Sequence, residues 1–151
     1  MKTIKGDLIR LAFEGQFDVI CHGCNCFCTF GAGIARQIAV KCPEAAIIDN
    51  YTRRGDAKKL GHFTAAEIER GKTKFIVVNA YTQFGCNINK VNVDYDAIRS
   101  CFQLIKEKYT GKRIGYPKIG AGLAKGDFSI ISKIIDEELV GEDHTLVEYQ
   151  L

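Results

Sequence analysis

The stretch from residue 19 to residue 39 constrains the fold more than any other part of the chain. The apolar run 17–21 predicts a short buried strand, and Gly23 and Asn25 predict a turn after it. Residues 31–33 read Gly-Ala-Gly, and an apolar-periodic helix begins there. A strand, a glycine-rich loop and a helix start in this order direct free backbone N–H groups toward a ligand. The stretch therefore predicts a site for an anionic group such as a phosphate.

A second stretch, residues 114–128, has the same order of elements. An apolar segment leads into Gly-Ala-Gly at 120–122, and a helix is predicted after it. Ligands of open α/β sheets bind at the carboxyl ends of the strands, so two such loops predict one shared site. Because glycine more often serves a turn than a ligand, tight turns alone remain the alternative interpretation.

The rest of the chain predicts strands that alternate with helices. We expect strands at 2–5, 113–116 and 145–149, a hairpin formed by 61–69 and 74–81, and helices that begin after Cys42, Asp94 and Asp127. The predicted fold is an α/β protein, a three-layer α/β/α sandwich over a mixed central sheet, in a single domain of residues 1–151. A polar loop with three asparagines is expected at 84–93.

The helix patterns also predict which side chains turn inward. The helix that begins at Pro43 and is expected to end at Gly55 is predicted to bury Ala46, Ile47 and Tyr51. The next two helices are expected to bury two longer apolar stripes, Ile98, Cys101, Phe102, Ile105 and Tyr109 in one, and Ile131, Ile134, Ile135 and Leu139 in the other. Asp94 and Asp127 stand where an N-cap residue is expected.

Composition and charge narrow the partners. The net charge is +3 with scattered basic residues, which argues against a basic face for long nucleic acid. No apolar run approaches the roughly 18 residues that a membrane span needs, and the N-terminus has no signal-peptide core, so we expect no membrane partner. The odd number of cysteines, seven, fits free thiols in a reducing cytoplasmic location.

Four of these cysteines, Cys21, Cys24, Cys26 and Cys28, raise the alternative of a zinc site. Structural zinc usually takes two short-spaced pairs from separate turns. Here all four thiols come from one strand end and its loop, where alternate side chains diverge. We therefore expect free thiols, no metal and no cofactor.

Four motifs across the chain resemble a macrodomain. They are Gly6-Asp7-Leu8, Asn25 with the Gly-Ala-Gly-Ile-Ala loop, Ile119-Gly-Ala-Gly-Leu, and the ending Val147-Glu-Tyr-Gln-Leu. Within that family, His22-Gly-Cys-Asn-Cys and the Tyr-Gln-Leu ending are similar to the yeast-type ADP-ribose 1''-phosphate phosphatases. The resemblance implies that the partner is ADP-ribose or ADP-ribose 1''-phosphate, with ADP-ribosylated macromolecules as a further class.

The resemblance also implies a role for each matching residue. Asp7 and Leu8 would hold the adenine, with the C-terminal residues nearby. The first loop would hold the distal ribose and diphosphate, and the second would cradle phosphate. The ligand-binding residues implied in this way are Asp7, Leu8, Asn25, Gly31, Ala32, Gly33, Ile34, Ile119, Gly120, Ala121, Gly122, Leu123, Tyr149 and Leu151.

For a phosphatase we predict the catalytic residues His22, Asn25 and Asp127. The ordinary imidazole pKa, about 6.5, suits His22 for proton transfer near neutrality, and Asp127 could orient water. The alternatives are a His22 that only hydrogen-bonds the loop and an Asp127 that only caps its helix.

One departure limits the resemblance. Related glycohydrolases use a lysine and an aspartate where this chain has Thr82 and Ala124. A covalent lysine route is therefore not expected. The alternative functions are an ADP-ribose-binding module without catalysis and a hydrolase that acts without the lysine.

Overall fold

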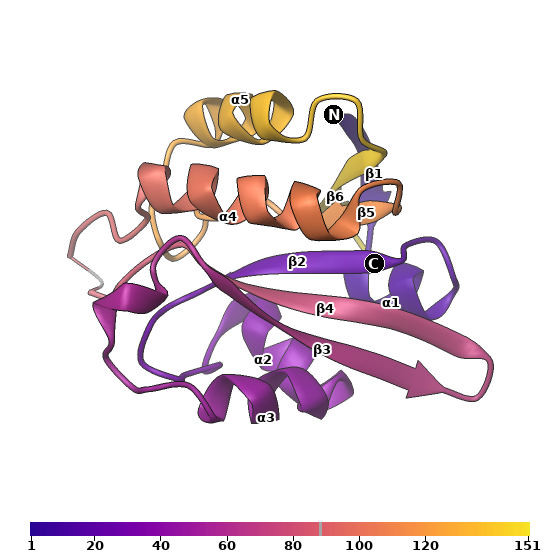
Figure 1. Ribbon diagram of the computed structural model, residues 1–151, viewed down its shortest axis with the longest axis horizontal. Coiled ribbons are helices and arrows are strands. Elements are labelled where there is room, and N and C mark those ends of the chain that lie inside the picture. Colours follow the sequence, from indigo (N-terminus) through magenta and orange to yellow (C-terminus); the bar gives the residue numbers. More distant parts are fainter. Residues whose placement is uncertain (88) are drawn as a thin grey trace.

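The computed structural model of the chain describes residues 1–87 and 89–151. A six-stranded sheet in the order β1-β6-β5-β2-β4-β3 lies between two layers of helices (Figure 1). The strands are β1 (Lys2–Gly6), β2 (Val19–Cys24), β3 (Phe63–Arg70), β4 (Thr73–Tyr81), β5 (Ile114–Tyr116) and β6 (His144–Tyr149). The helices are α1 (Leu8–Phe13), α2 (Gly33–Lys41), α3 (Pro43–Asn50), α4 (Tyr95–Tyr109) and α5 (Phe128–Glu138), with a short 3₁₀ helix η1 (Ala57–Lys59).

The sheet is mixed, as predicted. β3 runs antiparallel to β4 in the expected hairpin, and the other strand pairs are parallel. β2 and β5 are neighbours, yet the helices that follow them cover opposite faces: α2 lies below the sheet and α5 above it in Figure 1. A parallel sheet opens a crevice where its connections diverge in this way. The two glycine-rich loops follow β2 and β5, so they lie where these connections diverge.

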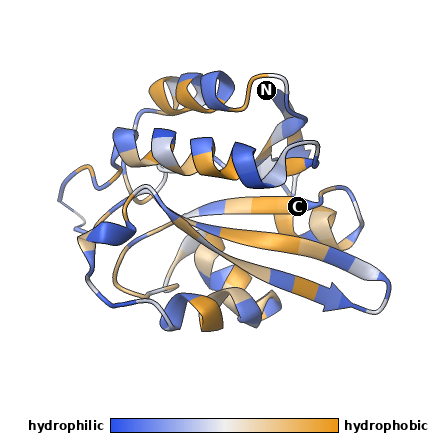
Figure 2. Cartoon of the chain, in the orientation of Figure 1, coloured by the Kyte–Doolittle hydropathy of each residue, from blue (hydrophilic) through white to orange (hydrophobic). Residues whose placement is uncertain are grey.

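The central strands are buried on both faces, which explains their continuous apolar sequence. Val19 and Cys21 of β2 pack into the core shared with α4 and α5, whereas Ile20 packs into the core shared with α2 and α3. Figure 2 shows hydrophobic colour over the first part of β2 and the middle of β4. Every residue of the two predicted apolar stripes in α4 and after Asp127 is buried.

Both predicted caps are present. The Asp94 carboxylate accepts from the Ala97 N–H, and the Asp127 carboxylate accepts from the Ser129 N–H. Each aspartate satisfies a helix N–H that has no partner within its own helix. The starts of α4 and α5 are therefore fixed by their own sequences.

Two predictions about elements are wrong. The second strand spans Val19–Cys24 rather than 17–21, because β5 and β4 pair with it on its two sides and the pairing to β4 continues to Tyr81. In α3, Ile47 and Tyr51 are exposed, by 55% and 85%. The buried positions are Ala45 and Asp49, because the Tyr81 hydroxyl of β4 donates to the Asp49 carboxylate at 2.6 Å.

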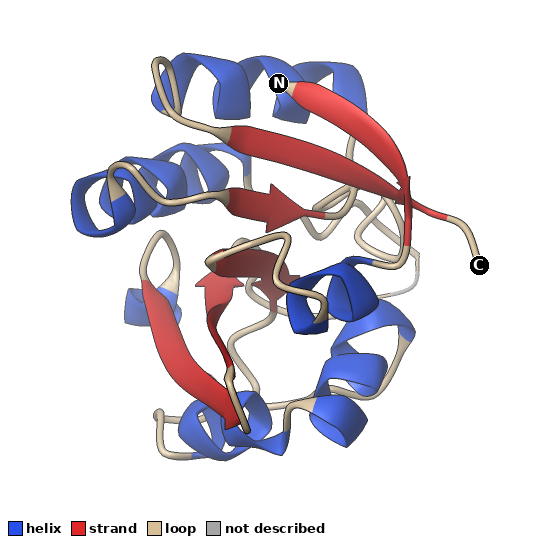
Figure 3. Cartoon of the chain, turned by 90° about the vertical axis from the view of Figure 1, so that its right-hand side faces the viewer, coloured by secondary structure: helices blue, strands red, loops and turns tan. Residues whose placement is uncertain are grey.

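β1 and β6 lie side by side at one edge of the sheet, with the two chain ends near them (Figure 3). Among residues 1–87 and 89–151, no helix combines the length and apolar character that crossing a bilayer requires.

Candidate functional site

Most of the predicted site residues lie at one end of the sheet, where the parallel strands have their carboxyl ends. In sheet order, Asp7 and Leu8 follow β1, Tyr149 ends β6, the 119–123 loop follows β5, and the 25–34 loop follows β2. Gly6 and Tyr149 are register partners, so the ends of β1 and β6 are direct neighbours. The structure thus arranges residues from four parts of the chain as a row.

At the β1 end of the row, Asp7 is the N-cap of α1. Its Oδ1 accepts from the N–H groups of Ile9 and Arg10, at 3.1 and 3.2 Å. Leu8 is buried, whereas Tyr149 and Leu151 are exposed by 64% and 94%. The exposed C-terminal side chains offer apolar surface at the same end of the sheet as Asp7.

The glycines of the two loops fall into two kinds. A Cβ on Gly120, which has φ +75°, would lie 2.7 Å from Val93, and one on Gly126 would lie 2.5 Å from the Gly120 carbonyl oxygen. By contrast, a Cβ on Gly31, Gly33 or Gly122 would meet nothing within 4 Å. The first kind is needed for the loop's own packing, and the second kind lines open space.

The helices that follow the two loops begin differently. Asp127 caps α5 with its own carboxylate, while the N-cap of α2 is Ala32, whose side chain accepts no hydrogen bond. The first N–H groups of α2 therefore face the loop without a side-chain acceptor from the N-cap. Such a helix start favours an anion.

Asn25 is held within the first loop. Its Oδ1 accepts from the Phe27 N–H at 2.8 Å, and its Nδ2 donates to the Thr29 hydroxyl at 2.7 Å. The same Nδ2 donates to the Cys86 sulfur at 3.0 Å, in the loop that follows β4. These contacts fix the amide at the junction of two loops.

His22 lies inside the core rather than beside the loop, because it belongs to β2. The side chain has no exposed surface, and its Nε2 lies 2.7 Å from the Asn79 Oδ1. The Asn79 amide nitrogen donates to the Ala45 carbonyl and the Thr64 hydroxyl, so its oxygen accepts from the imidazole. Burial lowers the pKa of His22 to about 4. This placement favours a neutral structural histidine over the proton-transfer role that the sequence predicts.

The other residues of interest have equally specific surroundings. Asp127 is exposed and engaged with the N–H and hydroxyl of Ser129. Thr82 is buried, and its hydroxyl has no hydrogen-bond partner among the described residues. Ala124 is buried, and its carbonyl oxygen accepts from the N–H groups of Asn92 and Val93.

The clustered cysteines point in different directions. Cys21 packs into the core shared with α4 and α5, whereas Cys24 and Cys26 pack against Tyr81. The Cys28 sulfur lies near the carbonyl oxygens of Asp49 and Thr52. Within the described part of the chain, no three His, Cys, Asp or Glu side chains gather as metal ligands would.

A cavity of about 510 Å³ lies beyond Asn25, between the first loop and the loop that follows β4. Its lining includes Phe27, Thr29, Arg54, Phe84, Cys86, Asn87, Lys90 and Asn92. Sequence reasoning missed this cavity, although the three asparagines of the 84–93 loop were a signal. The loop is folded on itself, since the Asn87 N–H donates to Asn92 Oδ1 at 2.9 Å and Asn92 Nδ2 donates back to the Asn87 carbonyl at 2.7 Å.

No protein-family model matches the chain. It is 38% identical over 141 residues to an uncharacterized 17.5 kDa protein from the tk-vs intergenic region of Enterobacteria phage T4, an alignment that covers 90% of this chain and 88% of that protein. The macrodomain of Mycobacterium tuberculosis DarG has the same fold, with a TM-score of 0.75 and 15% identity over 99% of this chain and 97% of its own.

Thermosipho africanus DarTG, solved in complex with ADP-ribose, gives a TM-score of 0.76 and 16% identity, over 99% of this chain and 41% of that protein. The strand order, the two glycine-rich loops and these likenesses agree. The chain has the macrodomain fold and belongs to the same family as the 17.5 kDa protein of phage T4.

Proposed function

We propose that the chain binds ADP-ribose across the row of strand ends. The main observation behind this proposal is the order of the strand ends. Exposed C-terminal side chains come first, and two glycine-rich loops with open space above Gly31, Gly33 and Gly122 follow. The adenine then lies beside Asp7 and Tyr149, the diphosphate between the loops, and the distal ribose beside Asn25. The complex of Thermosipho africanus DarTG with ADP-ribose supports this assignment.

We further propose that the reaction is hydrolysis of ADP-ribose 1''-phosphate to ADP-ribose and phosphate. The supporting observation is that Arg54 and Lys90 line the cavity beyond Asn25, where a phosphate on the distal ribose would project. Asn25 would position the ribose, and the amides of the second loop would hold the diphosphate. The buried His22 is left out of this assignment, and the reaction takes place in a cytoplasmic, reducing setting.

The second candidate function is ADP-ribose binding without catalysis, and the residues considered for catalysis favour it. His22 is buried, Thr82 and Ala124 replace the lysine and aspartate of related glycohydrolases, and Asp127 serves its own helix. These residues fit a module that recognises free or attached ADP-ribose without cleaving it.

Calorimetry with ADP-ribose tests the binding proposal. We expect saturable 1:1 binding that Gly122→Glu or Gly31→Glu removes, because each substitution places a carboxylate in the space assigned to diphosphate. Neither glycine has a positive φ, so the fold should tolerate both changes. Val140→Glu, at an exposed position beyond α5, is the matched control. An absence of binding at millimolar ADP-ribose would contradict the proposal.

Release of phosphate from ADP-ribose 1''-phosphate separates the enzyme from the binding module. Turnover by the wild-type protein that falls in Gly122→Glu supports the phosphatase. In the same assay, Asp127→Asn keeps the helix cap but changes the carboxylate. A large loss of turnover in this variant would assign Asp127 to the reaction, and binding without any turnover would establish the module.

A further inference from the structure

A cysteine and a lysine from separate segments of the chain meet beside the first glycine-rich loop. The Lys59 Nζ lies 3.7 Å from the Cys28 sulfur. Cys28 belongs to the 25–34 loop, and Lys59 is the last residue of η1. Among residues 1–87 and 89–151, no other cysteine sulfur lies within hydrogen-bond distance of a lysine amine. The pair distinguishes Cys28 from the other cysteines of the chain.

The lysine of this pair is held in place. Its Nζ donates to the Thr52 hydroxyl at 2.8 Å and lies 5.1 Å from the centroid of the Tyr81 ring. In the described part of the chain it forms no ion pair with a carboxylate. An amine that is fixed beside a sulfur reacts with it far more readily than an amine free in solution.

The cysteine of the pair anchors the loop to which it belongs. Its φ of +57° lies in the left-handed region, which residues other than glycine rarely adopt. The half-buried sulfur lies 3.4 Å from the Asp49 carbonyl oxygen and 3.4 Å from the Thr52 hydroxyl oxygen. These contacts join the first glycine-rich loop to the end of α3 and the turn after it.

Cys28 stands between residues that are assigned to the ligand. The Asn25 Nδ2 donates to the hydroxyl and the carbonyl of Thr29, at 2.7 and 3.3 Å, and Thr29 directly follows Cys28. Gly31 and Gly33, which line open space, come next in the same loop. A displacement of Cys28 would therefore move the partners that hold the Asn25 amide.

We propose that Cys28 and Lys59 form a reversible sulfur–nitrogen cross-link when the protein meets a hydroperoxide, and that this link keeps the first glycine-rich loop in its binding conformation. The cross-link depends on the two side chains alone. The protection of the loop rests on the proposed function, because it concerns the binding of ADP-ribose.

The reaction has two steps and needs no cofactor. The hydroperoxide transfers one oxygen to the Cys28 sulfur, its O–O bond breaks, and it leaves as water or an alcohol, so the thiol becomes a sulfenic acid. The Lys59 amine, after releasing one proton to water, attacks the sulfur. The N–S bond forms as the S–O bond breaks, and the hydroxyl leaves with one amine hydrogen as water. The protein has then lost two hydrogens, and the peroxide has gained two electrons.

The amine determines how far the oxidation goes. A sulfenic acid without a partner is oxidised further to a sulfinic acid, which thiols do not reduce. At Cys28 the negative charge of that group would face the carbonyl oxygens of Asp49 and Thr52. Repulsion would displace the residue, whereas the link to Lys59 leaves the sulfur uncharged and open to reduction by a thiol.

Peptide mapping by mass spectrometry after treatment with hydrogen peroxide tests the cross-link. We expect two peptides joined through Cys28 and Lys59, lower in mass by about 2 Da than their sum, which dithiothreitol separates. Lys59→Gln and Lys59→Arg should give no such pair and should carry a sulfinic acid at Cys28 instead. Lys58→Gln, at the exposed preceding residue of η1, is the matched control and should form the link as the wild type does.

Calorimetry with ADP-ribose before and after the same treatment tests the protection. The loss of affinity on treatment should be at least about fivefold larger in Lys59→Gln than in the wild type, which corresponds to roughly one net hydrogen bond. Each untreated protein is its own reference. Both proteins carry the exposed Cys86, so its oxidation affects them alike.

The outcomes separate the two parts of the inference. The cross-link is overturned if Cys28 of the wild type stays unmodified, stops at a sulfinic acid, or joins a residue other than Lys59. The protection is overturned if the link forms and the wild type still loses as much affinity as Lys59→Gln. If ADP-ribose does not bind at all, the proposed function fails, while peptide mapping still decides the cross-link.

Discussion

A single residue, His22, shows how position within a strand decides chemistry. From the sequence, it follows an apolar run and stands three residues before Asn25, which suggests a titratable group at the ligand. In the structure it is paired with Asn79 of β4 in the strand register and also through its side chain. Pairing with β4 extends β2 past Cys21 to Cys24, and sequence periodicity around one histidine cannot reveal that extension. The correction follows from strand pairing, a long-range property.

The buried His22 predicts a pH dependence of stability. The folded pKa, about 4, is lower than the ordinary value of 6.5, so the unfolded chain binds the proton more readily. The resulting stabilisation is complete above pH 6.5 and is lost as the pH falls toward 4, by on the order of 3 kcal/mol. Burial lowers the pKa of His144 as well, with the same sign.

Urea unfolding at several pH values measures this effect in the wild type and in His22→Gln, which keeps an amide donor for Asn79 but cannot titrate. The variant should show a shallower decline between pH 6.5 and 4. Equal slopes in the two proteins would show that His22 is not the titrating group.

Two elements, the glycine-rich loops, were predicted from local sequence because each strand–loop–helix unit is contiguous. The sequence could not show which of their glycines are needed for packing and which line open space. Gly120, for example, is constrained by Val93 and Ile131, which belong to other elements. It also missed the cavity, which needs Phe27, Arg54 and Phe84 from three segments. The buried face of α3 was predicted wrongly for a similar reason. Its Asp49 is buried because a tyrosine of β4, Tyr81, donates a hydrogen bond to it.

The distinction between the glycines predicts unequal effects of two similar substitutions. Gly120→Ala adds a Cβ at φ +75° and within 2.7 Å of Val93, so we expect a loss of about 1–3 kcal/mol in the free energy of unfolding. Gly122→Ala adds a Cβ in open space without a positive φ and should change stability by less than about 0.5 kcal/mol. Urea unfolding compares them, and equal losses would contradict the assignment.

The N-cap of α5 gives a second prediction at this scale. Asp127→Ala removes the acceptor of the Ser129 N–H and should destabilise the protein by about 1 kcal/mol, whereas Asp127→Asn should retain most of the stability. Thermal unfolding of the two variants measures the difference. An alanine variant as stable as the asparagine variant would argue against a capping role.

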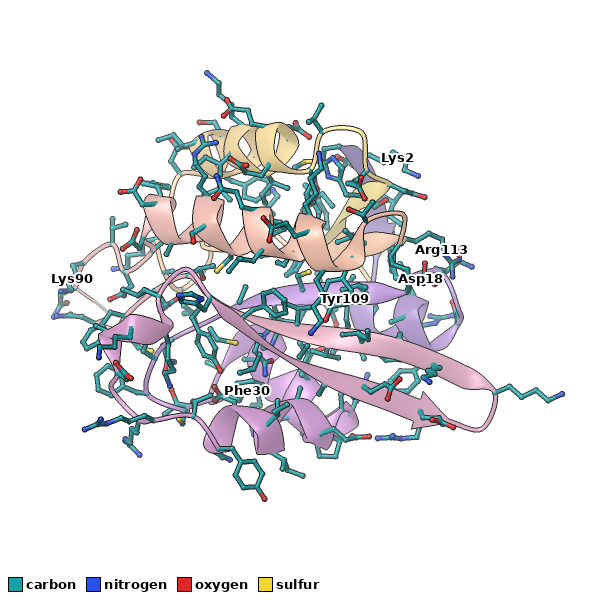
Figure 4. All side chains as sticks on the ribbon, in the orientation of Figure 1. Lys2, Asp18, Phe30, Lys90, Tyr109 and Arg113 are labelled. Atoms are coloured by element: carbon teal, nitrogen blue, oxygen red, sulfur yellow. The ribbon has the colours of Figure 1, made fainter. Side chains whose placement is uncertain are left out.

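At the scale of the whole molecule, one sheet joins two cores and leaves the site at one end. Asp18 precedes β2 and Arg113 precedes β5. The two side chains form a bidentate ion pair at the opposite end of the molecule from Lys90 (Figure 4). The amino ends of these neighbouring strands are therefore joined by side chains, while the chain continues from their carboxyl ends to helices on opposite faces of the sheet. Stability and binding are assigned to opposite ends of the same strands.

Because both cores pack on the same strands, we expect residues 1–151 to unfold as one domain. Ile38 belongs to the core shared with α2 and α3, and Ile105 belongs to the core shared with α4 and α5. Both side chains are fully buried. Replacing either with alanine should lower the free energy of unfolding by about 2–5 kcal/mol and shift one shared transition. Circular dichroism and tyrosine fluorescence in urea follow the unfolding, and separate transitions by the two probes would contradict a single domain.

The pairing of β1 with β6 has a consequence for the order of folding. In the described sheet β1 is an edge strand, and its register partners are residues 145–149 at the other end of the chain. During synthesis β1 therefore stays unpaired until residues 145–149 have been made. Contacts between residues so far apart in sequence slow folding, because the chain must close a long loop first. The nascent protein can build the β2–β4 region early, but the end of the sheet that carries Asp7 and Tyr149 forms only after residues 145–149 have been made.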